Sequence, residues 1–337
     1  MKNNRFNEQN IKPESKDFQE ALASDIAVLA ASKSKFIKVS CPACGKDDAG
    51  SAFEKYGFNF DVCRKCGTAY MNPRATPKIL RDFYEHSLVY ECWNKFIFPA
   101  SEKMRRENIV KPRVRRILEI CDKFDVPTDC LVEVGAGFGT FCKEAKATGR
   151  FSKIIAIEPM PALAQSCRKR GIETINDFIE NIKFLNTPPD IIVSFEVIEH
   201  LFSAEEFLKT CRGLMNPGSI IAVTCPNFKG FDISTLGIMS ESIDHEHINL
   251  FNPDSLKILF KRAGFEALEC FTPGELDAEI VRNKVLAGKF SVSDRLFLKT
   301  ILIDRWNELG AGFQKFLKEN NLSSHTWFVA RKPYDRK

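Results

Sequence analysis

Four cysteines in the first quarter of the chain have the spacing of a metal site. Cys41 and Cys44 form one C-x-x-C pair, Cys63 and Cys66 form a second, and 18 residues separate the pairs. A two-residue gap lets both thiolates of a pair reach one ion, and Zn²⁺ takes four such ligands in a tetrahedron. The pattern predicts a structural zinc ribbon with no open coordination position for a substrate.

Acids and histidines gather in two later segments, and they are the candidate catalytic residues: Glu196, Glu199, His200, His245 and His247. Two mechanisms are open for them. In the first, a histidine with a pKa near neutrality acts as general base on a hydroxyl or an acidic carbon. In the second, the carboxylates and imidazoles hold a divalent ion, such as Mg²⁺, Mn²⁺ or Zn²⁺, which lowers the pKa of a bound hydroxyl.

A glycine-rich turn predicts a ligand-binding site. The residues of this turn are Glu133, Gly135, Ala136, Gly137 and Gly139. Glycines let the backbone turn sharply and approach a ligand closely at a helix N-terminus. The spacing G-x-G-x-G departs from the dinucleotide pattern G-x-G-x-x-G. Glu158 follows 21 residues after Gly137, at the end of the next apolar segment. A carboxylate there can accept hydrogen bonds from both hydroxyls of a ribose.

Alternating strands and helices are expected to position these side chains. We expect strands near 130–134, 153–157, 171–175, 190–195, 219–225 and 267–271, and helices at about 139–148, 161–170, 203–215 and 253–263. This alternation predicts an α/β doubly wound, Rossmann-like sheet with a parallel core. The carboxyl ends of such strands line the ligand crevice, so the acids and histidines are expected to meet there.

The predicted domain organisation has four parts: a polar to helical lead-in over 1–37, a zinc ribbon over 38–75, a helical linker over 76–124 and a core over 125–337. Thr76 and Pro77 have the cap and first-turn preferences of a helix start. A helical insertion at about 275–322 interrupts the core, and it is interpreted either as a cap on the substrate side or as a dimer surface. His86 and His325 lie outside the candidate segments and are expected to be structural.

Composition excludes several classes of protein. The chain has 337 residues, 44% hydrophobic and 28% charged, which argues against collagen-like, coiled-coil and largely disordered proteins. The polar N-terminus and the lack of a run of about 18 apolar residues predict no secretory signal and no membrane span. A cytoplasmic protein with reduced thiols is expected. The net charge of +5 does not by itself call for nucleic acid.

The glycine turn together with Glu158 resembles motifs I and II of the class I S-adenosylmethionine-dependent methyltransferases. The resemblance covers about 125–275, and it implies a seven-stranded methyltransferase sheet with its last strand near 325–330. It also implies S-adenosylmethionine as cofactor, with the methionine part held by the glycine turn and the ribose by Glu158. Asp177 follows the third strand, where family members often place an acid near the adenine amine.

Two further stretches resemble narrower groups of these enzymes. The stretch from Cys63 through Met71-Asn-Pro-Arg74 to Pro77 is similar to that of members with an N-terminal four-cysteine zinc ribbon, many of which modify sugars, surface glycans or natural products. The E-x-x-E-H block with a later histidine resembles metal-dependent O-methyltransferases of ubiquinone biosynthesis and of small-RNA 3′-end methylation. The same block also occurs in relatives for which no metal need be assumed.

The leading hypothesis is therefore methyl transfer to a small-molecule acceptor, such as a glycan, a nucleotide sugar or a related metabolite. The alternative is an RNA methyltransferase that uses the zinc ribbon and the basic stretch 103–116 to hold nucleic acid. A third class is a cofactor-binding scaffold without activity, against which the intact glycine turn and Glu158 argue. No feature of the sequence specifies the oligomeric state.

Overall fold

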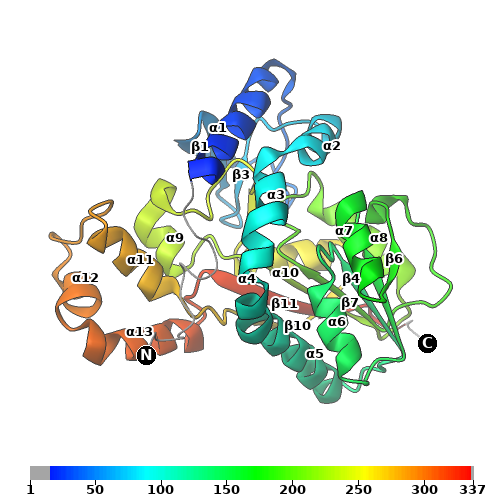
Figure 1. Cartoon of the computed structure of the whole chain (residues 1–337). Helices are drawn as coiled ribbons and strands as arrows, with labels where there is room; N and C mark the ends of the chain where they lie inside the picture. The colour runs from blue at the N-terminus through cyan, green and yellow to red at the C-terminus, as the bar shows by residue number, and fades with distance from the viewer. Residues whose placement is uncertain (1–15, 335–337) are drawn as a thin grey trace.

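The computed structural model describes residues 16–334, so residues 1–15 of the predicted lead-in and residues 335–337 lie outside the described residues. Its centre is a seven-stranded sheet in the order β10-β11-β8-β7-β4-β5-β6 (Figure 1). The strands are β4 (Cys130–Val134), β5 (Lys153–Ile157), β6 (Glu173–Ile175), β7 (Ile191–Phe195), β8 (Ile220–Pro226), β10 (Glu266–Phe271) and β11 (His325–Arg331). Strands β4 to β8 pair in parallel, and β11 is antiparallel to both β8 and β10. The predicted doubly wound, Rossmann-like methyltransferase sheet is confirmed.

Helices cover both faces of this sheet. On one face the buried side chains belong to α5 (Lys111–Lys123), α6 (Thr140–Ala147) and α7 (Pro161–Lys169), and on the other to α8 (Ala204–Leu214) and α10 (Pro253–Arg262). The boundaries follow local signals. Asn252 caps α10 through a hydrogen bond from the backbone N–H of Ser255, and Pro253 occupies its first turn. The expected elements of the core are therefore present within a few residues of their predicted limits.

The N-terminal part of the chain forms most of a second, four-stranded sheet, which we call the N-terminal sheet. Its strands are β1 (Ala49–Lys55), β2 (Phe58–Cys63), β3 (Ala69–Met71) and β9 (Asn249–Leu250), all antiparallel. The first three strands come from the predicted ribbon. The fourth, β9, belongs to the core segment and begins two residues after His247. The ribbon segment is thus joined to the core by strand pairing, which sequence periodicity did not indicate.

Arg74 strengthens this junction. Its guanidinium is fully buried and donates hydrogen bonds to Asn249 Oδ1 at 2.9 Å and to the carbonyl of Ile248 at 3.3 Å. Burying a guanidinium is tolerated only where its N–H groups find acceptors. The Met-Asn-Pro-Arg stretch therefore fixes the chain just after the two later histidines.

The remaining helices form two further groups. Before the core come α1 (Lys16–Ala31), α2 (Pro77–His86), α3 (Leu88–Cys92) and α4 (Phe98–Arg105), with π-helical turns at Trp93–Ile97 and Arg106–Val110. Within the predicted insertion lie α11 (Asp277–Leu286), α12 (Leu296–Lys299), a π-helical turn at Thr300–Asp304 and α13 (Trp306–Glu319). These pack against α9 (Phe231–Leu236) in a hydrophobic cluster of their own.

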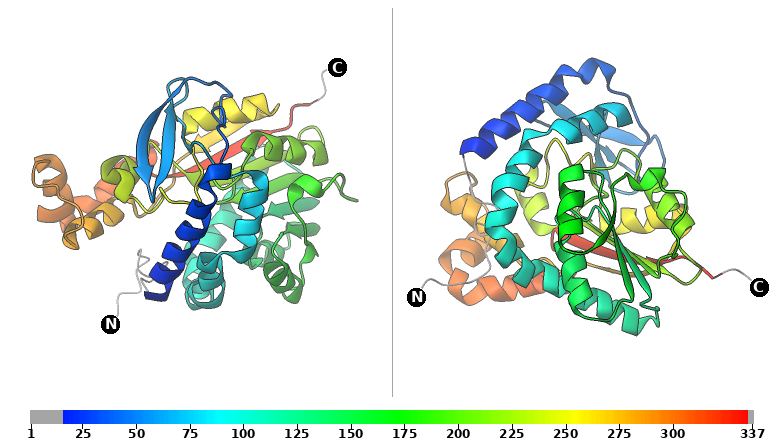
Figure 2. Two further views of the ribbon diagram at one scale, coloured as in Figure 1. Left: turned by 90° about the horizontal axis from the view of Figure 1, so that it is seen from above. Right: turned by 45° about the vertical axis from the view of Figure 1, so that its right-hand side comes forward.

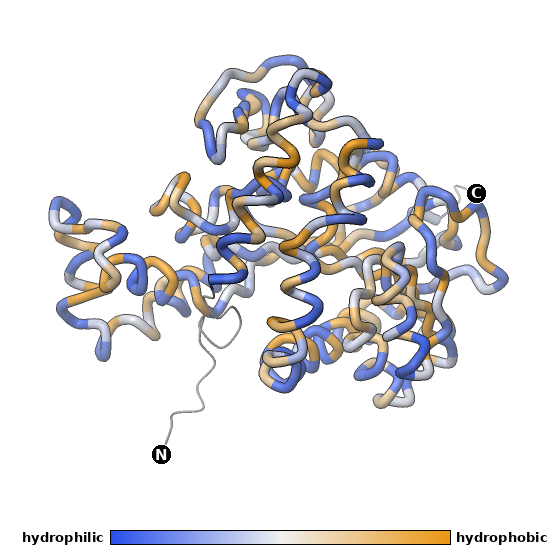
Figure 3. The backbone as a smooth tube through the Cα atoms, turned by 45° about the horizontal axis from the view of Figure 1, so that its top comes forward, coloured by the Kyte–Doolittle hydropathy of each residue, from blue (hydrophilic) through white to orange (hydrophobic). Residues whose placement is uncertain are grey.

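The insertion forms a lobe at the side of the molecule (Figure 2). Apolar segments recur through this lobe as well as through the central sheet (Figure 3). Within residues 16–334, no helix is long and apolar enough to cross a membrane. The twelve cysteines all lie in the described part of the chain, and none of them forms a disulfide.

Candidate functional site

One large cavity collects most of the predicted site residues. Its volume is about 1950 Å³, and it opens along the carboxyl ends of β4, β5 and β7. Further walls come from helices α1, α2, α3, α4, α5 and α11. A pocket for one ligand usually measures about 300–1000 Å³. The cavity therefore has room for a cofactor and an acceptor side by side.

The glycine turn forms the floor of this cavity at the start of α6. Gly135, Gly137 and Gly139 all have positive φ angles, of 77°, 55° and 72°. A Cβ atom on Gly135 would lie 2.6 Å from Val197, whereas a Cβ on Gly137 would meet nothing within 4 Å. The backbone at Gly137 thus faces open space, as close approach of a ligand requires. Ala136 beside it is buried.

Glu158 lies directly against this turn. Its Oε2 accepts a hydrogen bond from the backbone N–H of Gly137 at 2.8 Å, and its Oε1 accepts one from that of Met160 at 2.9 Å. Each oxygen keeps a lone pair that can accept a further hydrogen bond. Burial raises the pKa of Glu158 to about 7. The carboxylate is thus well placed for ligand hydroxyls, although it is not fully ionised at neutral pH.

Two other acids predicted for cofactor binding also line the cavity. Glu133 is buried, accepts a hydrogen bond from the thiol of Cys142 at 3.0 Å, and has its pKa raised to about 8 by burial. Asp177 is half-buried and accepts hydrogen bonds from the backbone of Phe178 and the amide of Asn181. Six of the seven predicted cofactor residues thus line the cavity. Gly139 is the exception, since a Cβ atom there would lie 2.9 Å from Sγ of Cys167.

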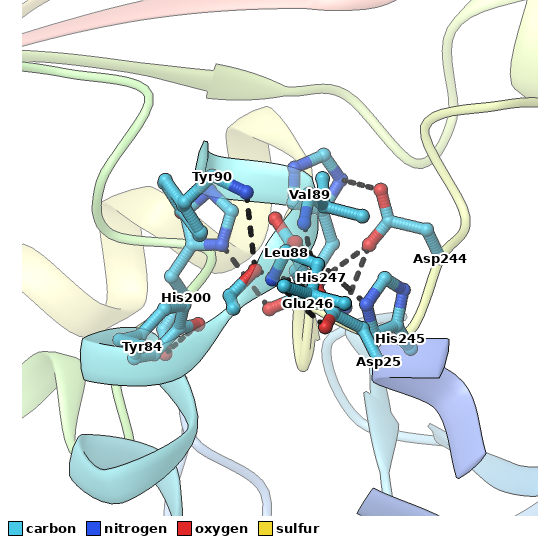
Figure 4. Close-up of polar contacts among 11 residues, drawn as sticks. Asp25, Tyr84, Leu88, Val89, Tyr90, His200, Asp244, His245, Glu246 and His247 are labelled. Atoms are coloured by element: carbon cyan, nitrogen blue, oxygen red, sulfur yellow. Dashed lines mark hydrogen bonds and ion pairs between the residues drawn. The ribbon is translucent and has the colours of Figure 1, made fainter. Parts of the chain in front are cut away.

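Glu199, His200 and His247 form a compact group at the end of β7. One ligand atom from each lies within 4.8 Å of the others. The ring centroids of His200 and His247 are 4.7 Å apart, and both side chains are drawn in Figure 4. Nδ1 of His200 lies 3.2 Å from the carbonyl of Glu246, and Nδ1 of His247 lies 2.8 Å from that of Ser242. A carbonyl partner places the proton on Nδ1, which leaves the Nε2 lone pair of each ring available to a metal.

The carboxyl group of Glu199 makes this group unusual. Its side chain is 1% exposed, and neither oxygen has a hydrogen-bond partner among residues 16–334. Burial and the neighbouring Glu196 raise its pKa well above the usual value. Burial also lowers the pKa of His200 to about 3. An unpartnered buried carboxyl beside two available imidazole nitrogens is the donor set that a divalent ion would satisfy.

Glu196 lies in a different set of contacts. Its φ of 55° is in the left-handed region, and its Oε1 accepts hydrogen bonds from Arg113 at 2.9 Å and Thr224 at 2.5 Å. Nδ1 of His325 is 3.5 Å from the same oxygen. Burial alone would raise the pKa of Glu196, but His325 and Arg113 hold it below its usual value. Glu196 is therefore a less suitable metal ligand than Glu199, because its carboxylate already has partners within the protein.

The structure also changes the description of two histidines expected to be structural. His325 comes from β11 and contacts Glu196, so it belongs to the strand-end cluster. His86 is exposed, lines the cavity, and has its Nδ1 2.8 Å from the carbonyl of Asp82. The placement of His325 had no local sequence signal, because it depends on contact with Glu196, which is distant in the sequence.

His245 is separate from the other two histidines of the crevice. Its ring is 2% exposed, and its two nitrogens have no hydrogen-bond partner within the described residues. It packs edge-on against Phe83 and Tyr56, with ring centroids 5.7 and 6.4 Å away. Burial lowers its pKa. Asp25 of α1, which the sequence did not single out, lies near this ring.

The four cysteines of the predicted zinc ribbon lie close together, as their spacing predicted. The Sγ atoms of Cys41 and Cys66 are 3.5 Å apart, as are those of Cys44 and Cys63. All four lie within 4.8 Å of one another. Tetrahedral Zn²⁺ with bonds of about 2.3 Å would place its sulfurs about 3.8 Å apart. The arrangement fits a zinc tetrathiolate.

The basic stretch 103–116 is largely engaged within the protein. Arg106 pairs with Glu144, Lys111 with Glu107 and Arg116 with Glu119, while Arg113 binds Glu196. Arg105 lies over the rings of Trp93 and Phe98 at about 5 Å. Five of the seven basic side chains thus pair with acids or lie over rings of the protein itself, several of them at the surface, which leaves fewer cations for the continuous basic face that RNA binding uses.

The strand order, the glycine turn and the acid after the next strand define a Rossmann-like methyltransferase. A family model described as a methyltransferase domain matches residues 102–270, about half of the chain, and the chain belongs to this family.

Curated relatives agree with this family. The chain is 31% identical over 77 residues to a protein of Mycolicibacterium smegmatis named "Probable S-adenosylmethionine-dependent methyltransferase", covering 23% of this chain and 28% of that one. It is 24% identical over 159 residues to the ubiquinone biosynthesis O-methyltransferase of Nitrobacter winogradskyi, covering 41% of this chain and 57% of that one. The chain thus matches between about a quarter and three fifths of the length of these relatives.

A solved structure shows the same fold at low sequence identity. It is a chain from the complex between the Haloferax volcanii Trm112 methyltransferase activator and a methyltransferase. The TM-score is 0.50 at 12% identity, over 73% of this chain and 98% of that chain.

Proposed function

We propose that this protein transfers the methyl group of S-adenosylmethionine to a small-molecule acceptor in the large cavity. The observation that carries the proposal is that Gly137, Glu158, His200 and His247 line one cavity, with the buried carboxyl of Glu199 directly beside the two histidines. Methyl transfer is an in-line displacement, so its main demands are orientation of both reactants and removal of a proton from the acceptor. A shared cavity meets the first demand.

The cofactor end of the cavity fits an adenosyl ligand. The open backbone at Gly137 would face the methionine part, and the oxygens of Glu158 would accept hydrogen bonds from the ribose hydroxyls. Glu133 would lie under the same turn, and Asp177 would lie near the adenine. When bound, the cofactor supplies an electrophilic methyl group on a sulfonium.

At the acceptor end we propose a divalent metal held by Glu199, His200 and His247. The unpartnered carboxyl of Glu199 and the two available Nε2 atoms support this choice. When bound, such an ion lowers the pKa of an acceptor hydroxyl. The O-methyltransferase among the relatives supports a hydroxyl acceptor. Arg113 and His325 fix the Glu196 carboxylate at the same edge of the sheet, where it would orient the acceptor.

The walls of the cavity favour a glycan, a nucleotide sugar or a related metabolite over RNA. They include Tyr56 in the turn between β1 and β2 and Asn283 in the insertion, so the insertion would act as a cap over the acceptor. The pairing of Arg106, Lys111 and Arg113 with acids of the protein also favours a small-molecule acceptor over RNA.

We further propose that the four cysteines hold a structural Zn²⁺ in a ribbon module over about 38–75. Four thiolates leave no coordination position for a substrate, so the ion would stabilise the folded module. The carbonyl of Cys66 accepts a hydrogen bond from Asn252, and that of Ala43 accepts one from Arg262. Through these contacts and the β3–β9 pairing, the ribbon would position the segment that carries His245 and His247.

Replacing Gly137 with Val should weaken binding of S-adenosylhomocysteine at least about 100-fold. The new side chain would project into the space proposed for the cofactor, and a β-branched residue is strained at a φ of 55°. The matched control is Gly149→Val, since Gly149 has a φ of 67° and equally open surroundings but does not line the cavity. Calorimetry on both variants checks the prediction, and equal affinities would refute the assignment of the turn.

Affinity for S-adenosylhomocysteine should fall as the pH drops through about 7. Glu158 has its pKa raised to about 7 by burial, and ribose hydroxyls donate to the ionised form. Below this pH the carboxyl is protonated and must lose its proton to bind, so the dissociation constant should be up to about 10-fold higher at pH 6 than at pH 8. In Glu158→Gln the constant should be higher throughout, and the part of the pH dependence that comes from Glu158 should be lost, which leaves only that of other groups such as Glu133. A wild-type profile that is flat between pH 6 and 8 would contradict this role.

A labelled-methyl experiment tests the acceptor class. The zinc-loaded protein is incubated with methyl-labelled S-adenosylmethionine, Mn²⁺ and three separate pools, namely nucleotide sugars, soluble glycans and RNA. We expect label in one of the first two pools. Label found in RNA alone would overturn the small-molecule proposal.

A further inference from the structure

We propose that Asp25, His245 and Glu246 form a second divalent-cation site, separate from the group Glu199–His200–His247. One ligand atom of each side chain lies within 4.8 Å of the other two. Asp25 comes from α1, and the other two residues come from the segment before β9 (Figure 4). The proposal does not depend on methyl transfer, because it concerns a site that neither the cofactor nor the first metal group uses.

His245 is the first observation that points to a ligand. The ring is 98% buried, yet its two nitrogens have no hydrogen-bond partner among the described residues. Leaving buried polar atoms without hydrogen-bond partners is costly. Phe83 and Tyr56 pack against the ring and hold it in this position. The ring is thus fixed with a lone pair available for a cation.

Asp25 is the second observation. It is 2% exposed, and its recorded partners are neutral: the hydroxyl of Ser87 at 2.6 Å and the backbone N–H groups of Leu88 and Val89, both at 3.0 Å. Within residues 16–334 no lysine or arginine forms an ion pair with it. A carboxylate offers about four lone-pair positions, so three donors leave one for a metal. Buried carboxylates without a cation are uncommon, since burial of an uncompensated charge is costly.

Glu246 completes the set. Its Oε1 lies 3.7 Å from Nε2 of His245, and its side chain is 11% exposed. With Asp25 and His245 it offers two carboxyl groups and one imidazole. A mixed oxygen and nitrogen set suits Mn²⁺, Fe²⁺ or Zn²⁺ and disfavours ions that require soft ligands.

The position of this site gives it a structural consequence. A cation bound there would join α1 to the segment that leads into β9, across a separation of about 220 residues in the sequence. Residues of α1 also line the cavity, at Phe18, Gln19 and Leu22. The second cation would therefore hold α1 as a wall of the acceptor space.

The test counts bound Mn²⁺ by electron paramagnetic resonance in the full, zinc-loaded chain. The chain carries one equivalent of Zn²⁺, and excess zinc is removed, so that zinc fills the cysteine site and the oxygen–nitrogen sites stay open to Mn²⁺, which competes poorly for thiolates. The variants are His245→Gln, Glu246→Gln, His247→Gln and the control His86→Gln. His245 has no native hydrogen bond to lose, and circular dichroism verifies folding of each variant.

We expect wild type and His86→Gln to bind two Mn²⁺ per chain, and His245→Gln, Glu246→Gln and His247→Gln to bind one. Removal of a ligand should weaken its own site at least about 100-fold. One Mn²⁺ in wild type that is lost in His245→Gln and retained in His247→Gln would still support the second site and would contradict the metal of the proposed function. Equal stoichiometry in wild type and folded His245→Gln would overturn the second site.

Discussion

Replacing His247 with Gln lowers the rate of methyl transfer at least about 100-fold and changes the affinity for S-adenosylhomocysteine less than about 3-fold. The reason is that the Nε2 atom of His247 is available on the proposed acceptor side of the cavity, whereas Gly137 and Glu158 form the proposed cofactor end. Losing a group that acts in the transition state reduces kcat without affecting cofactor binding. Single-turnover rates and calorimetry on the same preparation measure the two effects.

His86→Gln is the matched control for this result. His86 lines the same cavity but is exposed and lies on α2, so its replacement should leave the rate within about 2-fold. A His247→Gln variant with the wild-type rate would remove His247 from the proposed chemistry. A parallel loss of cofactor affinity would show that the substitution disturbs the whole cavity.

Replacing Cys41 and Cys63 together with Ser releases the zinc and lowers the melting temperature by roughly 10 °C. Structural zinc contributes directly to folding free energy, and each kcal/mol shifts the Tm of a chain this large by about 2–4 °C or less. The effect should reach the core, because β3 pairs with β9 and Arg74 holds Ile248 and Asn249. Metal analysis and calorimetric melting measure the two quantities.

The control for this variant is Cys270→Ser, which replaces a half-buried thiol of β10 outside the cysteine cluster. It should keep one zinc per chain. A double variant that keeps its zinc would refute the tetrathiolate, and one that loses zinc without a change in Tm would refute its structural role.

The core of the fold could be predicted because its signals are local. Apolar runs marked the parallel strands, and the Asn252 cap with Pro253 marked the start of α10. The glycine turn and Glu158 were recognised from type and spacing, and the structure places them in contact at 2.8 Å. In a βαβ unit, a fixed sequence separation brings the ends of neighbouring strands together.

The rest of the site depends on contacts between distant segments. Arg74 is a basic residue, which composition alone would place on the surface, yet its partners Ile248 and Asn249 bury it completely. Asp25 lies in an ordinary amphipathic helix, and only the tertiary fold brings it near His245. No periodicity in the sequence reports such pairings, since they arise from packing of segments about 170–220 residues apart.

The most direct test of the account is calorimetric titration of S-adenosylmethionine into the zinc-loaded chain. The account predicts one binding site per chain with a dissociation constant between about 1 µM and 1 mM, and no detectable binding to Gly137→Val under the same conditions. Absence of binding to the folded, zinc-loaded wild-type chain would contradict the central claim.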